Sequence, residues 1–217
     1  MRLLTVIMFC LISPGAIAQY IYVGATVGQY NMGEMKSIQE SARTLLNSQG
    51  FPVEKTLVFP ASLQLDLGLD WIKDKRSFGV FFNYARTVGK LDYSDYSGEL
   101  YEQQEIIRYA VGVKKAWTLK KGFGVYGKGG FNYNEIYFTD YIGLSQQPSQ
   151  KQVGTTETMG FIIEPGVQYF YPLGKVYFCL RAGFEINGKL PVKDGPETNW
   201  SGLRLSFAVG FDAKRNK

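Results

Sequence analysis

The chain has 217 residues, enough for one domain of ordinary size or for one sheet closed on itself. Aromatic residues make up 15% of it and 25 residues are glycine, which favours a β-rich protein with many turns. The formal charge of +5 comes without a long basic run, which argues against a nucleic-acid partner, and the lack of histidine excludes a Ser-His dyad and the usual histidine metal site.

Residues 1–19 have the features of a secretory signal peptide. Arg2 supplies a positive start, Leu3–Ile12 an apolar stretch, and Ala16–Ala18 a small-residue cleavage site. A transmembrane anchor is the alternative, because the uncharged sequence continues well past the apolar stretch. Pro14 interrupts that stretch, however, so we predict a leader that is removed on export.

Eight segments follow in which apolar residues alternate with polar or small ones. Period two places each set of side chains on one face of a strand. Each segment has about 10–14 residues, enough for a tilted strand to cross a bilayer, whereas strands of soluble proteins average about half that length. The predicted strands are residues 20–30, 61–72, 77–87, 105–117, 123–136, 158–171, 176–187 and 202–212.

The connections between these strands alternate in length. Short ones cover residues 73–75, 119–122 and 172–175, and long ones cover residues 31–60, 88–104, 137–157 and 188–201. Outer-membrane barrels have this layout, with the short turns in the periplasm. The pattern predicts a closed eight-stranded antiparallel transmembrane β-barrel over residues 20–212, followed by a short basic tail, residues 213–217.

Charged side chains collect on the face opposite the aliphatic one. In a barrel this face lines the lumen, and an eight-stranded lumen is just wide enough for side chains to fill. We expect the acids and bases to pair there and close the barrel, with Asp66 bound to Arg108 or Arg204. A paired-carboxylate site is the alternative for Asp66 and Glu164. The predicted lumen ion-pair network is Asp66, Asp70, Arg108, Lys114, Lys128, Glu164, Arg181, Glu185 and Arg204.

A soluble two-sheet sandwich would show the same alternation with its charges in water. It would not need strands of this length, nor aromatic residues near the ends of its apolar face. Such residues are typical of the girdles at the two membrane interfaces. The predicted interfacial aromatics are Trp71, Tyr84, Trp117 and Tyr171.

The first two long connections carry the candidate binding segments. In residues 33–50, apolar residues recur at helical spacing, Asn31 and Glu34 fit a capping box, and Gly50 can end the helix. This helix is either a lid or partner-binding element, or it packs its apolar stripe on the barrel rim. Residues 92–104 mix tyrosines with acids, a composition that suits contact with a protein or weak cation binding.

Three residues interrupt the regular outward face. Pro165 lies in the middle of a strand and has no N–H to donate, so a β-bulge is expected there. Gly127 and Gly129 leave a gap in the apolar face of another strand. If the barrel passes small apolar molecules through its wall, these three positions are where an opening is expected.

The last strand contains the motif RLSFAVGF, in which Arg204 is the polar member and Val209 and Phe211 are the closing apolar pair. With it, the chain resembles the small bacterial outer-membrane β-barrel superfamily, which includes OmpX-like, OmpW-like, OmpA-transmembrane-like and PorT-type proteins. The resemblance implies that the motif is a signal read by the barrel-insertion machinery. Ser206 stands where glycine is usual in this motif, and six residues follow the aromatic.

The resemblance further implies an outer-membrane location among outer-membrane lipids and a structural or loop-mediated binding role. The alternatives are OmpW-like passage of small apolar molecules, or an accessory role in secretion or envelope assembly. Enzymes of this superfamily depend on histidine, which the chain lacks, so no catalytic role is expected. No cofactor or metal is expected either. A protein partner would bind through residues 33–50 or 92–104.

Overall fold

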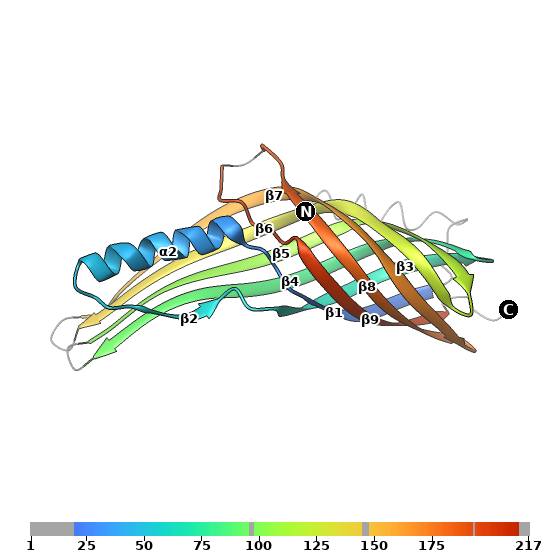
Figure 1. The fold of residues 1–217 in the computed structure, drawn as a ribbon, viewed down its shortest axis with the longest axis horizontal. Coiled ribbons are helices and arrows are strands. Elements are labelled where there is room, and N and C mark those ends of the chain that lie inside the picture. Colours follow the sequence, from blue (N-terminus) through green and yellow to red (C-terminus); the bar gives the residue numbers. More distant parts are fainter. Residues whose placement is uncertain (1–19, 96–97, 145–147, 193, 213–217) are drawn as a thin grey trace.

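The computed structural model describes residues 20–95, 98–144, 148–192 and 194–212. The predicted signal peptide and basic tail lie outside the described residues. None of the described helices is long and apolar enough to cross a membrane. The elements, shown in Figure 1, are β1 (Tyr20–Gly28), α2 (Gly33–Ser48), β2 (Glu54–Val58), β3 (Ser62–Lys73), β4 (Arg76–Asp95), β5 (Gly98–Lys120), β6 (Phe123–Leu144), β7 (Gln150–Leu173), β8 (Val176–Lys189) and β9 (Gly202–Asp212).

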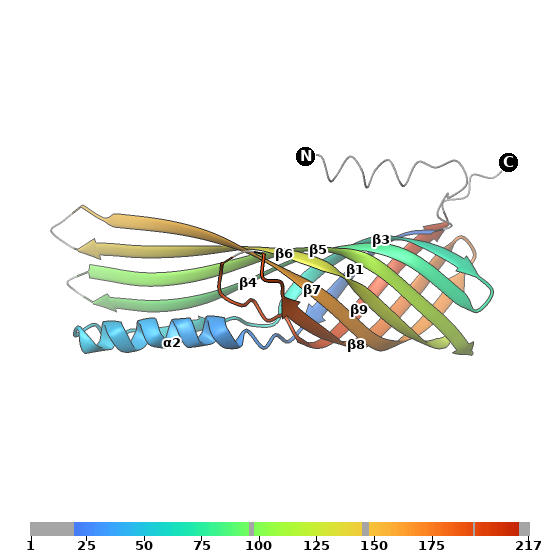
Figure 2. The same ribbon diagram turned by 90° about the horizontal axis from the view of Figure 1, so that it is seen from above.

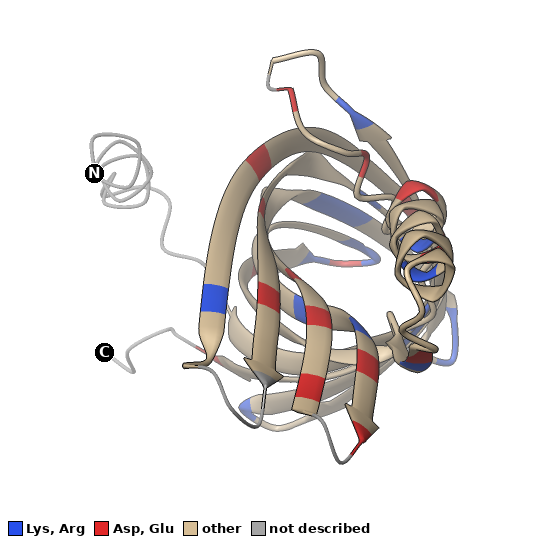
Figure 3. Cartoon of the chain, turned by 90° about the vertical axis from the view of Figure 1, so that its left-hand side faces the viewer, with Lys and Arg blue, Asp and Glu red and all other residues tan. Residues whose placement is uncertain are grey.

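Eight of the strands close into a ring. They follow the order β4-β3-β1-β9-β8-β7-β6-β5, and β5 pairs back with β4. The first strand, β1, is paired with the last strand, β9, along its full length, from Tyr20 opposite Asp212 to Gly28 opposite Arg204. Figure 3 shows the ring from the end that carries the long connections. The predicted eight-stranded antiparallel barrel is confirmed.

Two of the predicted long loops are β-structure instead. Strands β4 to β7 have 20, 23, 22 and 24 residues, and they extend as two hairpins well beyond the barrel (Figure 2). Residues 88–104 and 137–157 were therefore wrongly predicted as loops. Pairing continues there because tyrosines and apolar residues face each other across the strands; the rings of Tyr101 and Tyr141, for example, stack 4.9 Å apart. We call these outer halves of β4 to β7, together with β2, the outer sheet.

The predicted helix in the first connection is confirmed as α2, and Gly50 follows its end with φ 91°. The prediction of a capping box at Asn31 and Glu34 was wrong. Met32 is the N-cap, in a left-handed conformation and without a side-chain cap. The Glu34 carboxylate instead accepts a hydrogen bond from the backbone N–H of Glu197, in the connection between β8 and β9.

The apolar stripe of α2 packs on the inner face of the barrel rim and the outer sheet. Met35 is fully buried in a cluster at the barrel mouth, and Ile38 packs against it. Further along, Ala42 and Leu46 cover a second cluster that contains Leu91 of β4. The helix therefore lies docked with its apolar stripe covered, although Leu45, also predicted to lie in that stripe, is 59% exposed.

An exposed ion pair joins α2 to β2, and we expect it to give the docking a small dependence on pH. The hydrogen bond from Lys55 of β2 lowers the pKa of the Glu40 carboxyl below its ordinary 4.5. The contact therefore stabilises the docked helix above pH 4.5 and is lost as the pH falls through the lowered pKa. We expect an NMR titration to give Glu40 a pKa below 4.5 and to return it toward 4.5 in Lys55→Met. An unchanged pKa in that variant would contradict the contact.

Pro165 is accommodated without the predicted bulge. The β7–β8 ladder is interrupted between the pairs Ile163–Ile186 and Gly166–Gly183, and the register is the same on both sides of the interruption. β7 therefore accommodates the missing N–H of Pro165 by leaving out ladder pairs with β8, without an inserted residue. Irregularities that do shift the register lie elsewhere, between Lys55 and Leu57 and near the end of β5.

Candidate functional site

The lumen holds three layers of buried ionic groups, and Glu185 is the centre of the outermost one. Arg108 donates from Nη1 to Glu185 Oε1 at 2.7 Å and from Nη2 to Oε2 at 3.1 Å. Arg204 Nη2 lies 3.2 Å from Glu185 Oε2, and it also donates to the Trp200 carbonyl at 2.6 Å. These three charged side chains are almost completely buried, so one carboxylate binds two guanidinium groups away from solvent.

The middle layer is centred on Lys128. Its Nζ lies 3.4 Å from Glu164 Oε1 and 4.0 Å from Asp66 Oδ2. The Tyr126 hydroxyl donates to Glu164 at 2.5 Å, and Thr26 donates to Asp66 at the same distance. Asp66 and Glu164 thus share one lysine and do not form an isolated carboxylate pair.

The sequence suggested that Asp66 binds Arg108 or Arg204. In the structure it binds neither of them. In the strand ladders Asp66 lies opposite Gly24, whereas Arg204 lies opposite Gly28. Four residues along a strand correspond to about 13 Å, beyond the reach of an ion pair. The sequence places these side chains on one face but does not show their relative heights in the barrel.

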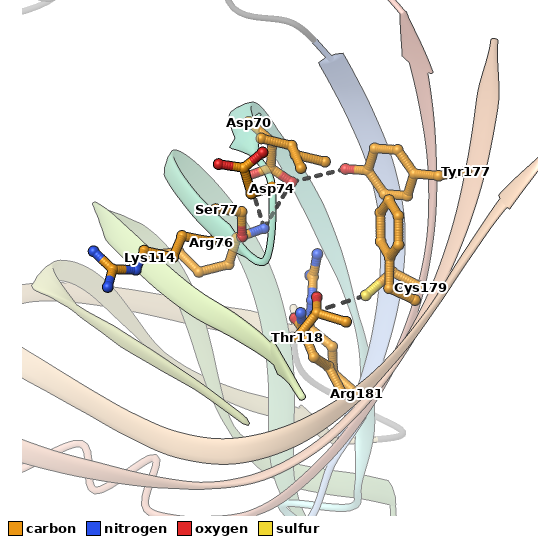
Figure 4. Close-up of a pocket in the computed structure, with 12 residues that line it drawn as sticks. Asp70, Asp74, Arg76, Ser77, Lys114, Thr118, Tyr177, Cys179 and Arg181 are labelled. Carbon is orange, nitrogen blue, oxygen red and sulfur yellow. Dashed lines mark hydrogen bonds and ion pairs between the residues drawn. The ribbon is translucent and has the colours of Figure 1, made fainter. Parts of the chain in front are cut away.

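The innermost layer lies toward the short turns. Lys114 Nζ and Tyr177 Oη bind Asp70 at 2.9 Å and 2.8 Å, as Figure 4 shows. The Lys114 ammonium also lies 4.4 Å from the centre of the Tyr22 ring. Arg181, the ninth residue of the predicted network, is buried beside this layer, with its guanidinium 5.1 Å from the same ring.

Trp200 closes the outer end of the lumen. Its ring is completely buried beneath α2, packs edge-on against Tyr30 at 4.6 Å and lies 5.3 Å from the Arg108 guanidinium. Its indole N–H donates to Asn134 Oδ1 at 2.9 Å. Trp200 was not predicted from the sequence, because it precedes the last alternating segment and carries no periodic signal of its own.

Three tyrosines that bind or contact the ionic groups were also missed, although their strands do carry a signal. Tyr22, Tyr126 and Tyr177 lie at the same parity as the lumen-facing residues of β1, β6 and β8. Their positions were therefore predictable, because the alternation along a strand places aromatic residues as it places charged ones. The lumen thus contains buried ion pairs and aromatic side chains, and among the described residues no three acids or cysteines are grouped to hold a metal ion.

The outer face of the ring has the opposite character. On β3, Leu63 and Leu65 point outward and are 68% and 45% exposed. Asp66, which lies between Leu65 and Leu67, is 2% exposed. Closure satisfies the backbone groups of the strands, so such a ring can present an apolar surface to lipid. The fold is that of a small outer-membrane β-barrel.

Comparison with solved structures finds small barrels that are similar to this chain at low identity. Neisserial surface protein A is similar at 11% identity, over 89% of this chain and 96% of that one, with a TM-score of 0.44. Ail, the attachment invasion locus protein of Yersinia pestis, is similar at 13% identity, over 88% and 95%, with a TM-score of 0.41. The N-terminal barrel domain of Pseudomonas aeruginosa OprF is similar at 12% identity, over 89% and 97%, with a TM-score of 0.34. No family model and no curated protein matches the sequence.

The predicted interfacial aromatics all lie on the outward face of the barrel. Trp71, Trp117 and Tyr171 lie near the short turns, and the Trp71 ring is 6.0 Å from that of Phe78 on the next strand. Tyr84 lies toward the outer end, 5.6 Å from the ring of Tyr109. Two rows of aromatic side chains, one toward each end, suit the two interfaces of a bilayer.

The predicted insertion motif forms β9. Its polar member, Arg204, points into the outermost lumen layer, and Phe211 is 51% exposed on the outer face opposite Ile21 of β1. Val209 lies opposite Val23 of β1 and Phe178 of β8. The motif therefore belongs to the strand that closes the barrel, and its recognition by insertion machinery stays a prediction.

The residues proposed for a lateral opening lie in two different settings. Gly127 and Gly129 keep their ladder pairs with both neighbouring strands. The ladder interruption lies beside Pro165, on the β8 side of β7. Glu164 is buried there, bound by Tyr126 and Lys128, so packed side chains lie behind the interruption.

Proposed function

We propose that this protein is an outer-membrane barrel with a closed lumen, which binds another protein through the free edge of its outer sheet. The observation that carries the proposal is a difference between the two edges of the outer sheet: one is free and the other is paired. β7 pairs with β6 from Gln150 onward but with β8 only from Gly160. In the part of the chain that the structure describes, no strand pairs with the other side of residues 150–155, which are all exposed.

The opposite edge of the outer sheet is covered. β2 pairs with β4 there, from Glu54 opposite Asp92 to Val58 opposite Gly89. α2 contacts β2 in turn, because the Gln39 amide donates to the Leu57 carbonyl at 2.8 Å. Natural proteins usually block exposed edges because these pair with other chains. A free edge opposite one that is paired with β2 supports a role in strand addition, in which an extended segment of the partner extends the sheet.

The other elements of the site support binding more than transport or catalysis. Three ionic layers and Trp200 fill the lumen. The carboxylates of Asp66 and Glu164 share Lys128, and the chain has no histidine, so the proposed role is not catalytic. Residues 92–104, which lie in the β4–β5 hairpin, and the outer surface of α2 are the alternative binding surfaces. An accessory role in secretion or envelope assembly would use the same edge.

Photo-crosslinking in intact cells tests the proposal. A photoreactive residue replaces Val153, which is 57% exposed on the free edge, or Leu57 on the covered edge as a matched control. We expect one predominant adduct from position 153 and none from position 57, with the crosslinked peptide identified by mass spectrometry. Adducts of equal yield at both positions, or none at position 153, would contradict binding at the free edge.

A further inference from the structure

The lumen contains one more positive charge than negative charge. Among the described residues, nine charged side chains are buried: the acids Asp66, Asp70, Glu164 and Glu185, and the bases Arg108, Lys114, Lys128, Arg181 and Arg204. Each acid has at least one basic partner, and four of the five bases have an acidic one. Arg181 is the exception. An unpaired buried charge is costly, so a compensating group is expected near it.

The Arg181 guanidinium has hydrogen-bonding capacity that the protein does not use. The side chain is 4% exposed, and neither Nε nor Nη1 has a hydrogen-bond partner among the described residues. Among the described residues, the face of the Tyr22 ring contacts the guanidinium and attracts its charge but accepts no conventional hydrogen bond, and Asp66 and Asp70, which are bound to other groups, attract it from a longer distance. Figure 4 shows Arg181 apart from the group formed by Asp70, Lys114 and Tyr177.

A cavity lies beside this guanidinium. Its volume is about 100 Å³, and its lining includes Lys114, Thr118, Gln168 and Arg181. These residues offer two cations, a hydroxyl and an amide. Asp70 and Asp74 also line the cavity, but Asp70 is bound to Lys114 and Tyr177, and Asp74 lies in the exposed turn after β3. That turn places the cavity at the periplasmic end of the barrel, where solutes of the periplasm can reach it.

We propose that this cavity binds one small monovalent anion of the size and charge of chloride, held by Arg181. One negative charge balances the single excess positive charge of the lumen. The volume corresponds to about three water molecules, which suits a halide with a water or two. A divalent oxyanion would overcompensate the charge next to the Asp70 carboxylate. The site would fix the inner end of the lumen and is independent of the free edge of the outer sheet.

Thermal unfolding of the full-length protein in detergent tests the proposal. The unfolded fraction is measured from the difference in gel migration between the folded and unfolded forms. Sodium chloride is compared with sodium gluconate, whose anion is too large for the cavity, and with sodium sulfate at equal ionic strength. We expect chloride to raise the unfolding midpoint by about 2–4 °C with saturation, because it binds only the folded state. Equal midpoints in chloride and gluconate, or an equal rise in sulfate, would overturn the proposal.

Two further measurements locate the site. Arg181→Met is expected to abolish the chloride dependence, whereas Lys115→Met, which removes an exposed lysine on the outer face, is expected to keep it. Chloride dependence that survives in Arg181→Met would overturn the assignment. Because that variant can fail to fold, crystals of the unchanged protein grown in bromide provide a second readout. An anomalous peak in contact with the Arg181 guanidinium is expected, and its absence would also overturn the proposal.

Discussion

Replacing Glu185 with glutamine is expected to lower the free energy of unfolding by about 3–5 kcal/mol. Among the described residues, Glu185 is the only carboxylate bound to Arg108 or to Arg204. Its loss leaves two guanidinium groups in a closed space with the Trp200 carbonyl and two aromatic rings as remaining contacts. Urea unfolding in lipid vesicles, followed by tryptophan fluorescence, measures the change.

A matched control separates the buried ionic layer from the general effect of removing a negative charge. Glu54→Gln removes an exposed carboxylate from β2 and is expected to change stability by less than about 0.5 kcal/mol. If Glu185→Gln behaves like this control, water in the lumen must solvate the two arginines, and the closed-lumen proposal is wrong. Replacing Arg108, Glu185 and Arg204 together with methionine or leucine is expected to recover much of the loss, because no charge then remains unpaired.

Replacing Trp200 with alanine is expected to cost about 3–5 kcal/mol and to release α2 from the barrel mouth. The indole is completely buried in the cluster that also contains Tyr30, Met32 and Met35, and an alanine would leave a cavity there. Met32 and Met35 belong to the start of α2, so the loss acts directly on the docking of the helix. Urea unfolding gives the stability, and hydrogen exchange over residues 33–48 reports the docking.

The control for this variant is Phe51→Ala. Phe51 follows α2, is 36% exposed, and contacts Tyr93 with ring centres 6.0 Å apart. Its removal makes no closed cavity and is expected to leave the first half of α2 as protected as before. If Trp200→Ala left the exchange of α2 unchanged, the cluster at the mouth would not be what holds the helix.

The closed ring of eight strands and the direction of each side chain could be predicted from the sequence. Alternation along a strand is a local property, and eight segments with the same alternation, joined by short and long connections in turn, leave few other folds. Asp66 could therefore be placed in the lumen and Leu63 on the outer face, as the structure has them. The helix over residues 33–48 was predictable for the same reason, since its periodicity is also local.

The outer sheet could not be predicted in this way, because it depends on pairing between distant segments. Residues 88–104 and 137–157 carry charges and tyrosines without a clear apolar face along each segment. They form strands because residues on neighbouring strands pair with them, and α2 packs against the first of the two segments near Leu91 and Leu100. The free edge at residues 150–155 follows from where β8 ends, which no feature of those residues indicates.

The partners of the buried charges were likewise decided by the tertiary structure alone. Parity along a strand says which way a side chain points but not its height in the barrel, which depends on the register between neighbouring strands. Asp66 binds Lys128 for that reason, and Glu185 holds two arginines. Arg181 is left without an acid because the nearest carboxylates are bound elsewhere. The sequence by itself determined which charged strand residues enter the lumen, and only the three-dimensional register decided which of them meet, because an ion pair needs contact within a few ångströms.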